Sequence, residues 1–164
     1  LYNSAYLGFD TETRPSFKKG KSTPVTLLQL ATTEESFLFR LNKIGLPEEI
    51  RYIFSNPDIQ KIGAAIHDDI KSLQDINSFL PMGFLDLQNL VKKFGIESQS
   101  LKKLTAIVLN FRISKSQQLT NWDAEILTEA QQKYAAMDAW VALQIFLKLK
   151  SVMNNSGNLL NHDS

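Results

Sequence analysis

The stretch Tyr6-Leu7-Gly8-Phe9-Asp10-Thr11-Glu12 decides how this sequence folds and what it can bind. Its apolar beginning is typical of a buried strand, which we predict over residues 5–10. Residues i and i+2 of a strand point to one side, so Asp10 and Glu12 should project together where the strand ends. Two carboxylates this close repel each other unless one is protonated or a cation lies between them. Since Mg²⁺ and Mn²⁺ prefer oxygen ligands, the pair indicates a divalent metal site.

The composition is that of one domain with a hydrophobic core. The chain has 164 residues, 43% of them hydrophobic, and a formal net charge of +1. Any binding to nucleic acid must therefore depend on a local basic surface. The absence of cysteine excludes disulfides and thiolate zinc sites. No apolar run reaches the roughly 18 residues of a membrane helix and no signal peptide is visible, so we expect a cytoplasmic protein with no membrane partner.

The pattern of apolar and turn-forming residues predicts three strands, then alternating helices and strands, then helices. The strands are predicted over residues 5–10, 25–31, 36–40, 61–66 and 84–86, and the helices over 47–54, 68–76, 87–94, 101–109 and 129–153. Thr128 and Gln131 form a capping-box pattern before the last helix. We expect one domain over residues 1–153 and a disordered tail over 154–164. This order favours a mixed sheet with helices on its faces.

A second acidic pair, Asp68-Asp69, follows the fourth predicted strand. Ligands of open α/β sheets gather at the carboxyl ends of strands, which is where this pair should lie. Helix capping is the alternative, and this segment alone favours it, because either carboxylate would complement the N-terminus of the next helix. We expect His67 to be a satisfied or exposed histidine, and Asp86 to cap a helix rather than bind metal.

A carboxylate on an apolar helix face is the third observation. One stripe of the last predicted helix contains Tyr134, Asp138, Val141, Ile145 and Leu149. A buried carboxylate needs a partner, which is either a cation or a basic side chain. Tyr134 lies one turn before Asp138, so its phenol either reaches whatever Asp138 binds or is a core aromatic.

Taken together, the three segments offer an all-oxygen cluster of four carboxylates and one phenol. The carboxylates are Asp10, Glu12, Asp69 and Asp138. Such a cluster suits two Mg²⁺ ions about 4 Å apart, which stabilise the attacking and leaving oxygens in phosphodiester hydrolysis. The Tyr134 phenol would orient the attacking water or help to deprotonate it.

These segments resemble the three exonuclease motifs of the DEDD superfamily. The matching segments are Phe9-Asp10-Thr11-Glu12-Thr13, the stretch from Gly63 through Asp69 to Leu73, and Tyr134-Ala-Ala-Met-Asp138. The Tyr-x-x-x-Asp spacing is that of the tyrosine subclass. Leu119-Thr-Asn-Trp122 and Leu127-Thr-Glu-Ala-Gln are similar to the Werner syndrome exonuclease and ribonuclease D branch. The resemblance runs over residues 6–149 and implies an α/β, ribonuclease H-like (DnaQ-like exonuclease) fold, with a five-stranded mixed sheet flanked by helices.

The resemblance also implies an activity and a role for each motif residue. It implies 3′-5′ removal of nucleotides as 5′-monophosphates, with two Mg²⁺ or Mn²⁺ ions per active site as cofactors. Asp10 would bridge both ions, Glu12 and Asp138 would bind the first, and Asp69 would hold the second, partly through water. Tyr134 would position the attacking water. Asp69 rather than Asp68 fits the spacing of the motif.

The expected partner is nucleic acid, and we expect DNA rather than RNA. The chain resembles a Werner-type domain, and only 26 residues follow Asp138, too few for the helical domains of ribonuclease D. The alternatives are a ribonuclease D-like exoribonuclease and, in a different class, a catalytically silent nucleic-acid-binding domain. The sequence predicts no oligomeric state.

Basic and aromatic residues outside the motifs offer further candidates. Lys18, Lys19 and Lys21 form a candidate phosphate-contacting loop, with an ordinary solvated loop as the alternative. Lys92-Lys93 and Lys102-Lys103 are expected to be solvated helix faces. Base stacking would be the functional role of Trp122 and Trp140, but packing is the interpretation that we favour for both.

Overall fold

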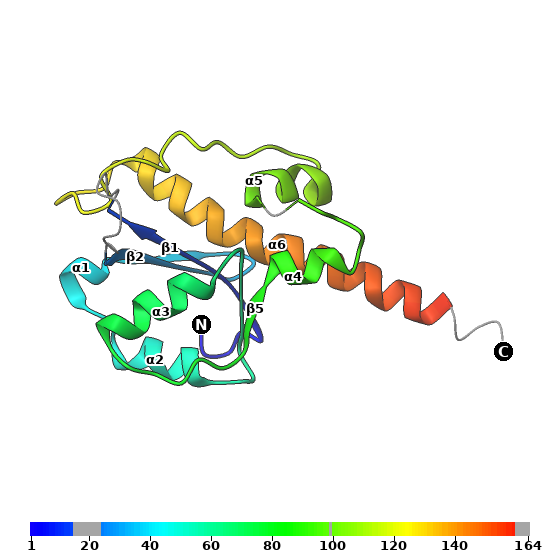
Figure 1. Ribbon diagram of the computed structural model, residues 1–164, viewed down its shortest axis with the longest axis horizontal. Helices are drawn as coiled ribbons and strands as arrows, with labels where there is room; N and C mark the ends of the chain where they lie inside the picture. Colours follow the sequence, from blue (N-terminus) through cyan, green and yellow to red (C-terminus); the bar gives the residue numbers. More distant parts are fainter. Residues whose placement is uncertain (15–23, 99, 160–164) are drawn as a thin grey trace.

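A computed structural model describes residues 1–14, 24–98 and 100–159, and its centre is a five-stranded sheet (Figure 1). The strands are β1 (Tyr6–Thr13), β2 (Val25–Ala31), β3 (Ser36–Phe39), β4 (Gln60–Gly63) and β5 (Phe84–Asp86). Their order across the sheet is β3-β2-β1-β4-β5. β1 pairs antiparallel with β2 and parallel with β4, so the predicted five-stranded mixed sheet is confirmed.

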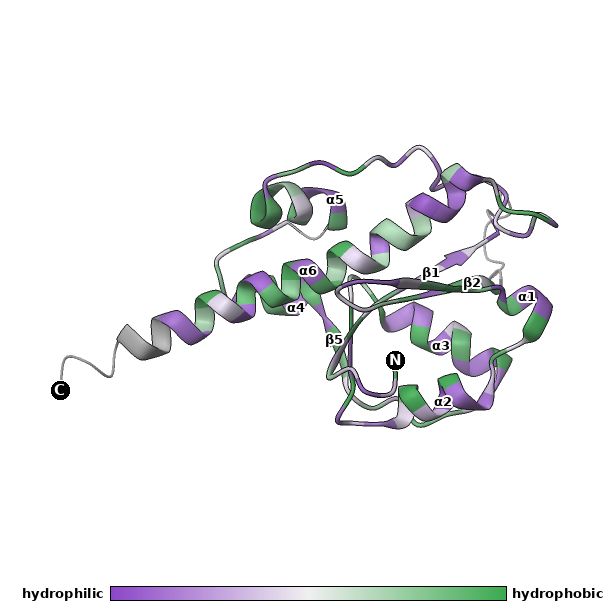
Figure 2. Cartoon of the chain, turned by 180° about the vertical axis from the view of Figure 1, so that it is seen from behind, coloured by the Kyte–Doolittle hydropathy of each residue, from purple (hydrophilic) through white to green (hydrophobic). Residues whose placement is uncertain are grey.

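Helices cover both faces of this sheet (Figure 1). They are α1 (Leu41–Ile44), α2 (Glu48–Ser55), α3 (His67–Ile76), α4 (Leu87–Lys92), α5 (Leu101–Leu104), a π-helical stretch over Thr105–Leu109, and α6 (Glu129–Leu159). α2 and α3 lie on one face and α6 crosses the other, with its C-terminal part projecting past the sheet and mixing hydrophilic with hydrophobic residues (Figure 2). Within the described ranges, no helix combines the length and apolarity needed to span a membrane.

Two boundaries differ from the prediction in ways that matter. β1 does not end at Asp10 but continues to Thr13, because β2 pairs with it from Gly8 to Thr13, with Asp10 opposite Gln29. Strand pairing thus overrides the low strand propensity of the charged residues. α6 continues to Leu159, so the tail predicted from residue 154 is helical over 154–159, and residues 160–164 lie outside the described ranges. The asparagines and glycine there weaken a helix by less than about 1 kcal/mol each, which does not stop one already formed.

Smaller differences concern helices. The sequence did not predict α1, and the helix predicted over 101–109 is divided into α5 and the π-helical stretch, which ends at Asn110 in a left-handed conformation (φ 61°). Ser100 precedes α5, and its side chain makes no capping hydrogen bond. The capping box of α6 is confirmed: the Thr128 N–H donates to Gln131 Oε1 (3.0 Å), and the Gln131 N–H donates to Thr128 Oγ1 (3.2 Å).

Gly8 explains how the sheet and α6 come together. Leu7 and Phe9 point into the core that packs against α2 and α3, so Gly8 lies on the opposite face, toward α6. A Cβ atom on Gly8 would lie 1.9 Å from the carbonyl oxygen of Ala139, so the helix rests directly on the strand backbone. Because Asp138 precedes Ala139 and Asp10 shares the face of Gly8, this contact brings the two carboxylates together.

Candidate active site

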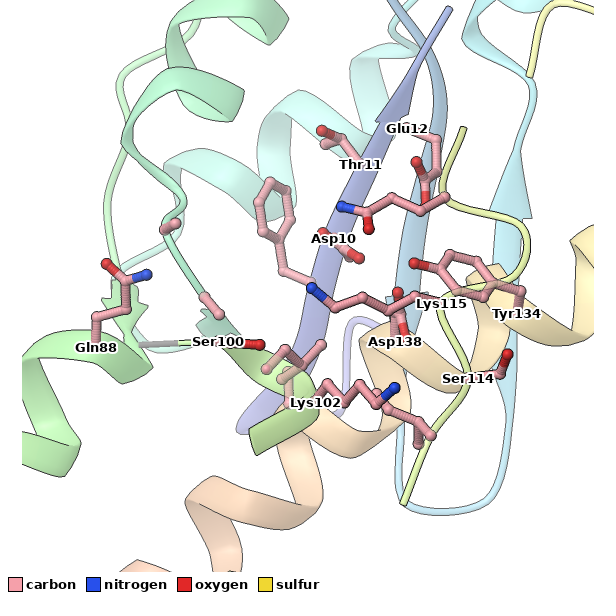
Figure 3. Close-up of a pocket in the computed structure, with 17 residues that line it drawn as sticks. Asp10, Thr11, Glu12, Gln88, Ser100, Lys102, Ser114, Lys115, Tyr134 and Asp138 are labelled. Atoms are coloured by element: carbon pink, nitrogen blue, oxygen red, sulfur yellow. The ribbon is translucent and has the colours of Figure 1, made fainter. Parts of the chain in front are cut away.

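Three of the four predicted carboxylates converge between β1 and α6 (Figure 3). Asp10 and Glu12 project from the face of β1 that meets α6, and Asp138 projects from the helix. One carboxylate oxygen from each residue lies within 4.8 Å of those of the other two. The alternation of a strand and the crossing at Gly8 are therefore sufficient to assemble this group.

The group carries uncompensated negative charge. Burial, followed by the charge of Asp10, raises the pKa of Glu12 to about 9. Burial, followed by the charges of Asp138 and Asp69, raises the pKa of Asp10 well above its usual range. Burial raises the pKa of Asp138 to about 6, although the Tyr134 hydroxyl and Lys115 act in the opposite direction. Each shift records the cost of holding ionised carboxylates together in a partly dry site.

A divalent cation fits this group. Asp138 is only 7% exposed, and its Oδ1 has no hydrogen-bond partner among the described residues. A buried carboxylate oxygen without a donor is unfavourable unless it binds a cation. All the ligand atoms are oxygens, which is the donor set that Mg²⁺ and Mn²⁺ prefer.

Tyr134 presents its hydroxyl to the same group. Figure 3 shows the phenol beside the Asp138 carboxylate, and its ring packs against buried Trp122 with centroids 5.9 Å apart. Burial, and then the charge of Asp138, raises the pKa of the phenol above its ordinary value. The hydroxyl therefore stays protonated and acts as a hydrogen-bond donor, which suits the orienting role better than the role of a base.

Asp69 occupies a different position from the other three carboxylates. It lies in the first turn of α3 and accepts a 2.6 Å hydrogen bond from the Thr11 hydroxyl, on the opposite face of β1 from Asp10 and Glu12. It lies outside the three-carboxylate group, although its charge contributes to the raised pKa of Asp10. Asp68 is exposed, and among the described residues its side chain makes no such hydrogen bond, so the two adjacent acids differ in their surroundings.

The other predicted residues take structural positions or lie outside the described ranges. Asp86 caps α4 as predicted, accepting from the Gln88 N–H (2.8 Å) and the Ala65 N–H (3.1 Å). His67 is exposed, and the Trp140 indole donates to the Thr33 carbonyl (3.1 Å), which fits packing at the surface. The basic loop of Lys18, Lys19 and Lys21 falls within residues 15–23, which the structure does not describe.

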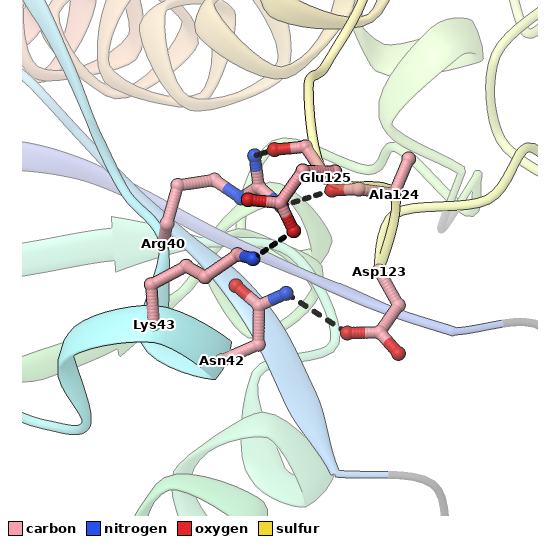
Figure 4. Close-up of polar contacts among 6 residues, drawn as sticks. All are labelled: Arg40, Asn42, Lys43, Asp123, Ala124 and Glu125. Carbon is pink, nitrogen blue, oxygen red and sulfur yellow. Dashed lines mark hydrogen bonds and ion pairs between the residues drawn. The ribbon is translucent and has the colours of Figure 1, made fainter.

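A set of polar contacts fixes the segment between Trp122 and α6 (Figure 4). Arg40 donates to the carbonyl oxygens of Ala124 and Glu125. Asn42 Nδ2 donates to Asp123 Oδ1 (2.8 Å), and Lys43 forms an ion pair with Glu125. Together with the capping box, these contacts hold Trp122 against Tyr134 and so limit how the phenol can move.

Sequence analysis missed several residues that line the pocket above the carboxylates. The cavity measures about 270 Å³, and its wall includes Ser100, Lys102, Ser114, Lys115 and Gln118 (Figure 3). No motif contains them, because they come from α5 and from the irregular segment before α6. The only sequence feature that could have found them is the excess of basic residues in this part of the chain.

Comparison with known proteins gives the class to which this fold and site belong. The family model described as 3′-5′ exonuclease matches residues 1–154, so the chain belongs to the 3′-5′ exonuclease domain family of the DEDD superfamily. The Tyr134-x-x-x-Asp138 spacing is that of the tyrosine subclass.

Individual relatives lie on the branch that the motifs indicated. The chain is 36% identical over 143 residues to mouse exonuclease 3′-5′ domain-containing protein 2, covering 80% of the chain and 22% of that protein. It is 33% identical over 156 residues to the mouse bifunctional 3′-5′ exonuclease/ATP-dependent helicase WRN, covering 91% of the chain and 11% of that protein. The chain also matches the structure of Escherichia coli ribonuclease D, which is described as an exoribonuclease involved in structured RNA processing. The TM-score is 0.80 and the identity 27%, and the match covers 94% of this chain and 41% of that one. The chain thus spans less than a quarter of the two curated relatives.

Proposed function

We propose that this protein removes nucleotides from the 3′ end of DNA and releases them as nucleoside 5′-monophosphates, using two Mg²⁺ or Mn²⁺ ions. The observation that carries the proposal is the convergence of Asp10, Glu12 and Asp138, whose oxygens lie within 4.8 Å of one another. The unpartnered Oδ1 of Asp138 supports a cation at this place rather than a basic side chain.

Each residue has a distinct role in this proposal. The bound ions would activate a water molecule and stabilise the charge that develops on the leaving oxygen. Asp10, Glu12 and Asp138 would hold them on the α6 side of β1. Asp69 would hold the second ion from α3, partly through water, and the effect of its charge on the pKa of Asp10 supports this role. The Thr11 hydroxyl fixes the orientation of Asp69, as groups behind a metal ligand commonly do. Tyr134 donates a hydrogen bond that orients the attacking water.

DNA is the proposed substrate because the chain resembles the Werner-type branch. The chain is 33% identical to the WRN protein over 91% of its own length. The second candidate, a 3′-5′ exoribonuclease, is favoured by the close structural match to ribonuclease D, and the two relatives together leave the polymer to be decided by experiment.

A pair of neighbouring substitutions tests the proposal. Asp69→Ala should lower the rate of hydrolysis by more than about 100-fold, because it removes a metal ligand. Asp68→Ala is the matched control, since it removes the adjacent, exposed carboxylate, and it should retain nearly full activity. Asp10→Ala should abolish hydrolysis while sparing nucleic-acid binding in metal-free buffer. If Asp68→Ala and Asp69→Ala behaved alike, the assignment of the second metal ligand would be wrong.

A further inference from the structure

The segment opposite the carboxylates is basic, although the chain as a whole is almost neutral. Residues 87–118 contain six basic side chains and one acidic side chain, which are Lys92, Lys93, Lys102, Lys103, Arg112, Lys115 and Glu97. This segment has a net charge of +5, whereas the whole chain has +1, so the remainder has −4. The positive charge is therefore local and lies beside the site.

Two of these six basic residues line the catalytic pocket. Lys102 extends from α5 and Lys115 from the segment before α6, and Figure 3 shows both side chains directed into the pocket from these separate elements. Lys102 is half-buried, and its neighbour Lys103 is exposed. In the part of the chain that the structure describes, neither Lys102 nor Lys115 has a carboxylate within ion-pair distance.

Binding a polyanionic strand at this site requires positive charge beyond that of the metal ions. Four ionised carboxylates, Asp10, Glu12, Asp69 and Asp138, would carry −4, and two divalent ions would cancel that charge. A neutral metal centre attracts a polyanionic strand only weakly, and binding to nucleic acid depends chiefly on phosphate contacts. The lysines on the opposite wall supply charge where the strand must lie.

We propose that Lys102 and Lys115 bind two successive phosphates of a single strand, with Lys115 at the phosphate being cleaved and Lys102 at a neighbouring one. The inference rests on the proposed function. Lys115 is assigned to the cleaved phosphate because it lines the same pocket as Asp138, and Figure 3 shows its side chain beside the carboxylates. Lys102 is assigned to the neighbouring phosphate because it projects from a different element across the pocket. The solvated role predicted for the Lys102-Lys103 pair is thus retained only for Lys103.

The salt dependence of binding tests this assignment. A fluorescent single-stranded oligodeoxynucleotide with phosphorothioate linkages at its 3′ end would be titrated in Ca²⁺ buffer at several KCl concentrations. Each lost phosphate contact should reduce the slope of log Kd against log salt by about 0.7. We expect that reduction for Lys102→Gln and for Lys115→Gln, and about 1.4 for the double variant. Lys103→Gln, which removes the same charge from the next position, should leave the slope unchanged, and Lys102→Arg should restore it.

Kinetics distinguish the two lysines. Lys102→Gln should raise KM for the same sequence with normal linkages in Mg²⁺ and leave kcat unchanged, because it weakens ground and transition state equally. Lys115→Gln should lower kcat by at least about tenfold, because the charge on the cleaved phosphate changes in the transition state.

The outcomes separate this inference from the proposed function. Suppose that the unaltered protein hydrolyses the oligonucleotide but the slopes for Lys102→Gln and Lys115→Gln equal that for Lys103→Gln. This result would overturn the phosphate contacts and leave the proposed function standing. Slopes that fall as expected in a protein that hydrolyses nothing would support the phosphate contacts and count against the exonuclease.

Discussion

Replacing Glu12 by glutamine should stabilise the metal-free protein while abolishing hydrolysis. The pKa of Glu12 is about 9, against an ordinary value of 4.5. At pH 8 Glu12 is ionised in the unfolded chain, whereas the folded site favours its protonated form. Protonating it at a pH about 3.5 units above its ordinary pKa costs up to about 5 kcal/mol. Glutamine resembles the protonated form and avoids this cost. Because the repulsion is shared with Asp10 and Asp138, we expect a gain of about 2 kcal/mol.

Urea unfolding at pH 8 in EDTA measures this gain directly. Glu12→Gln should shift the midpoint to higher urea without changing the slope of the transition. Glu34→Gln, which removes an exposed carboxylate away from the site, is the matched control and should leave the midpoint unchanged. At millimolar Mn²⁺ the order should reverse, because the unaltered protein gains binding energy that the variant has lost. Destabilisation by Glu12→Gln in EDTA would refute the view that these carboxylates strain the apo site.

Three further perturbations follow from the same geometry. The pKa values of Glu12 (about 9) and Asp138 (about 6) are raised above their unfolded values, so the stability that these two groups contribute to the metal-free protein should be fully present below about pH 4 and be lost as the pH rises to 9. Thermal unfolding from pH 5 to pH 9 checks this loss, and Mn²⁺ should remove much of it. Gly8→Ala places a Cβ atom 1.9 Å from the Ala139 carbonyl oxygen, so it should cost about 3 kcal/mol in urea unfolding and lower hydrolysis by displacing Asp138. Gly95→Ala would meet no atom within 4 Å, so it should cost only the backbone strain of a positive φ (70°), about 1 kcal/mol, and leave hydrolysis unchanged. The fully buried ammonium of Lys61 donates to the carbonyls of Ile53, Asn56 and Ile59 (2.9, 2.9 and 2.6 Å). Lys61→Met removes these donors and should lower the free energy of unfolding by about 2–4 kcal/mol without altering the metal dependence of activity. Unchanged thermal unfolding would show that these carbonyls find other donors.

Much of the fold could be predicted from the sequence because periodicity and turn residues specify it locally. The strand Val25–Ala31 and the strand Phe84–Asp86 were predicted with the observed bounds. The position of Asp10 within β1 rather than at its end could not be predicted, because it depends on pairing with β2, a contact that local propensity does not encode.

The candidate site divides in the same way. Asp10, Glu12 and Asp138 were predictable because the strand period of two and the helix period of about 3.6 place each carboxylate on a known face. The separate position of Asp69 was not predictable, because it depends on the contact of α3 with Thr11 on the other side of the strand. Lys115 was missed because the irregular segment before α6 has no period from which a direction could be read, and Lys102 was expected to be solvated because a charge pair on a helix usually is.

Digestion of end-labelled oligonucleotides tests the central claim most directly. Single-stranded DNA, 3′-recessed duplex DNA and RNA would each be incubated with Mg²⁺, Mn²⁺ or EDTA, with Asp10→Ala in parallel lanes. The account predicts a ladder that shortens from the 3′ end only with metal and only with the unaltered protein, strongest on DNA. A ladder strongest on RNA would favour the exoribonuclease. No cleavage of any polymer by the folded protein would contradict the account and favour a silent nucleic-acid-binding domain.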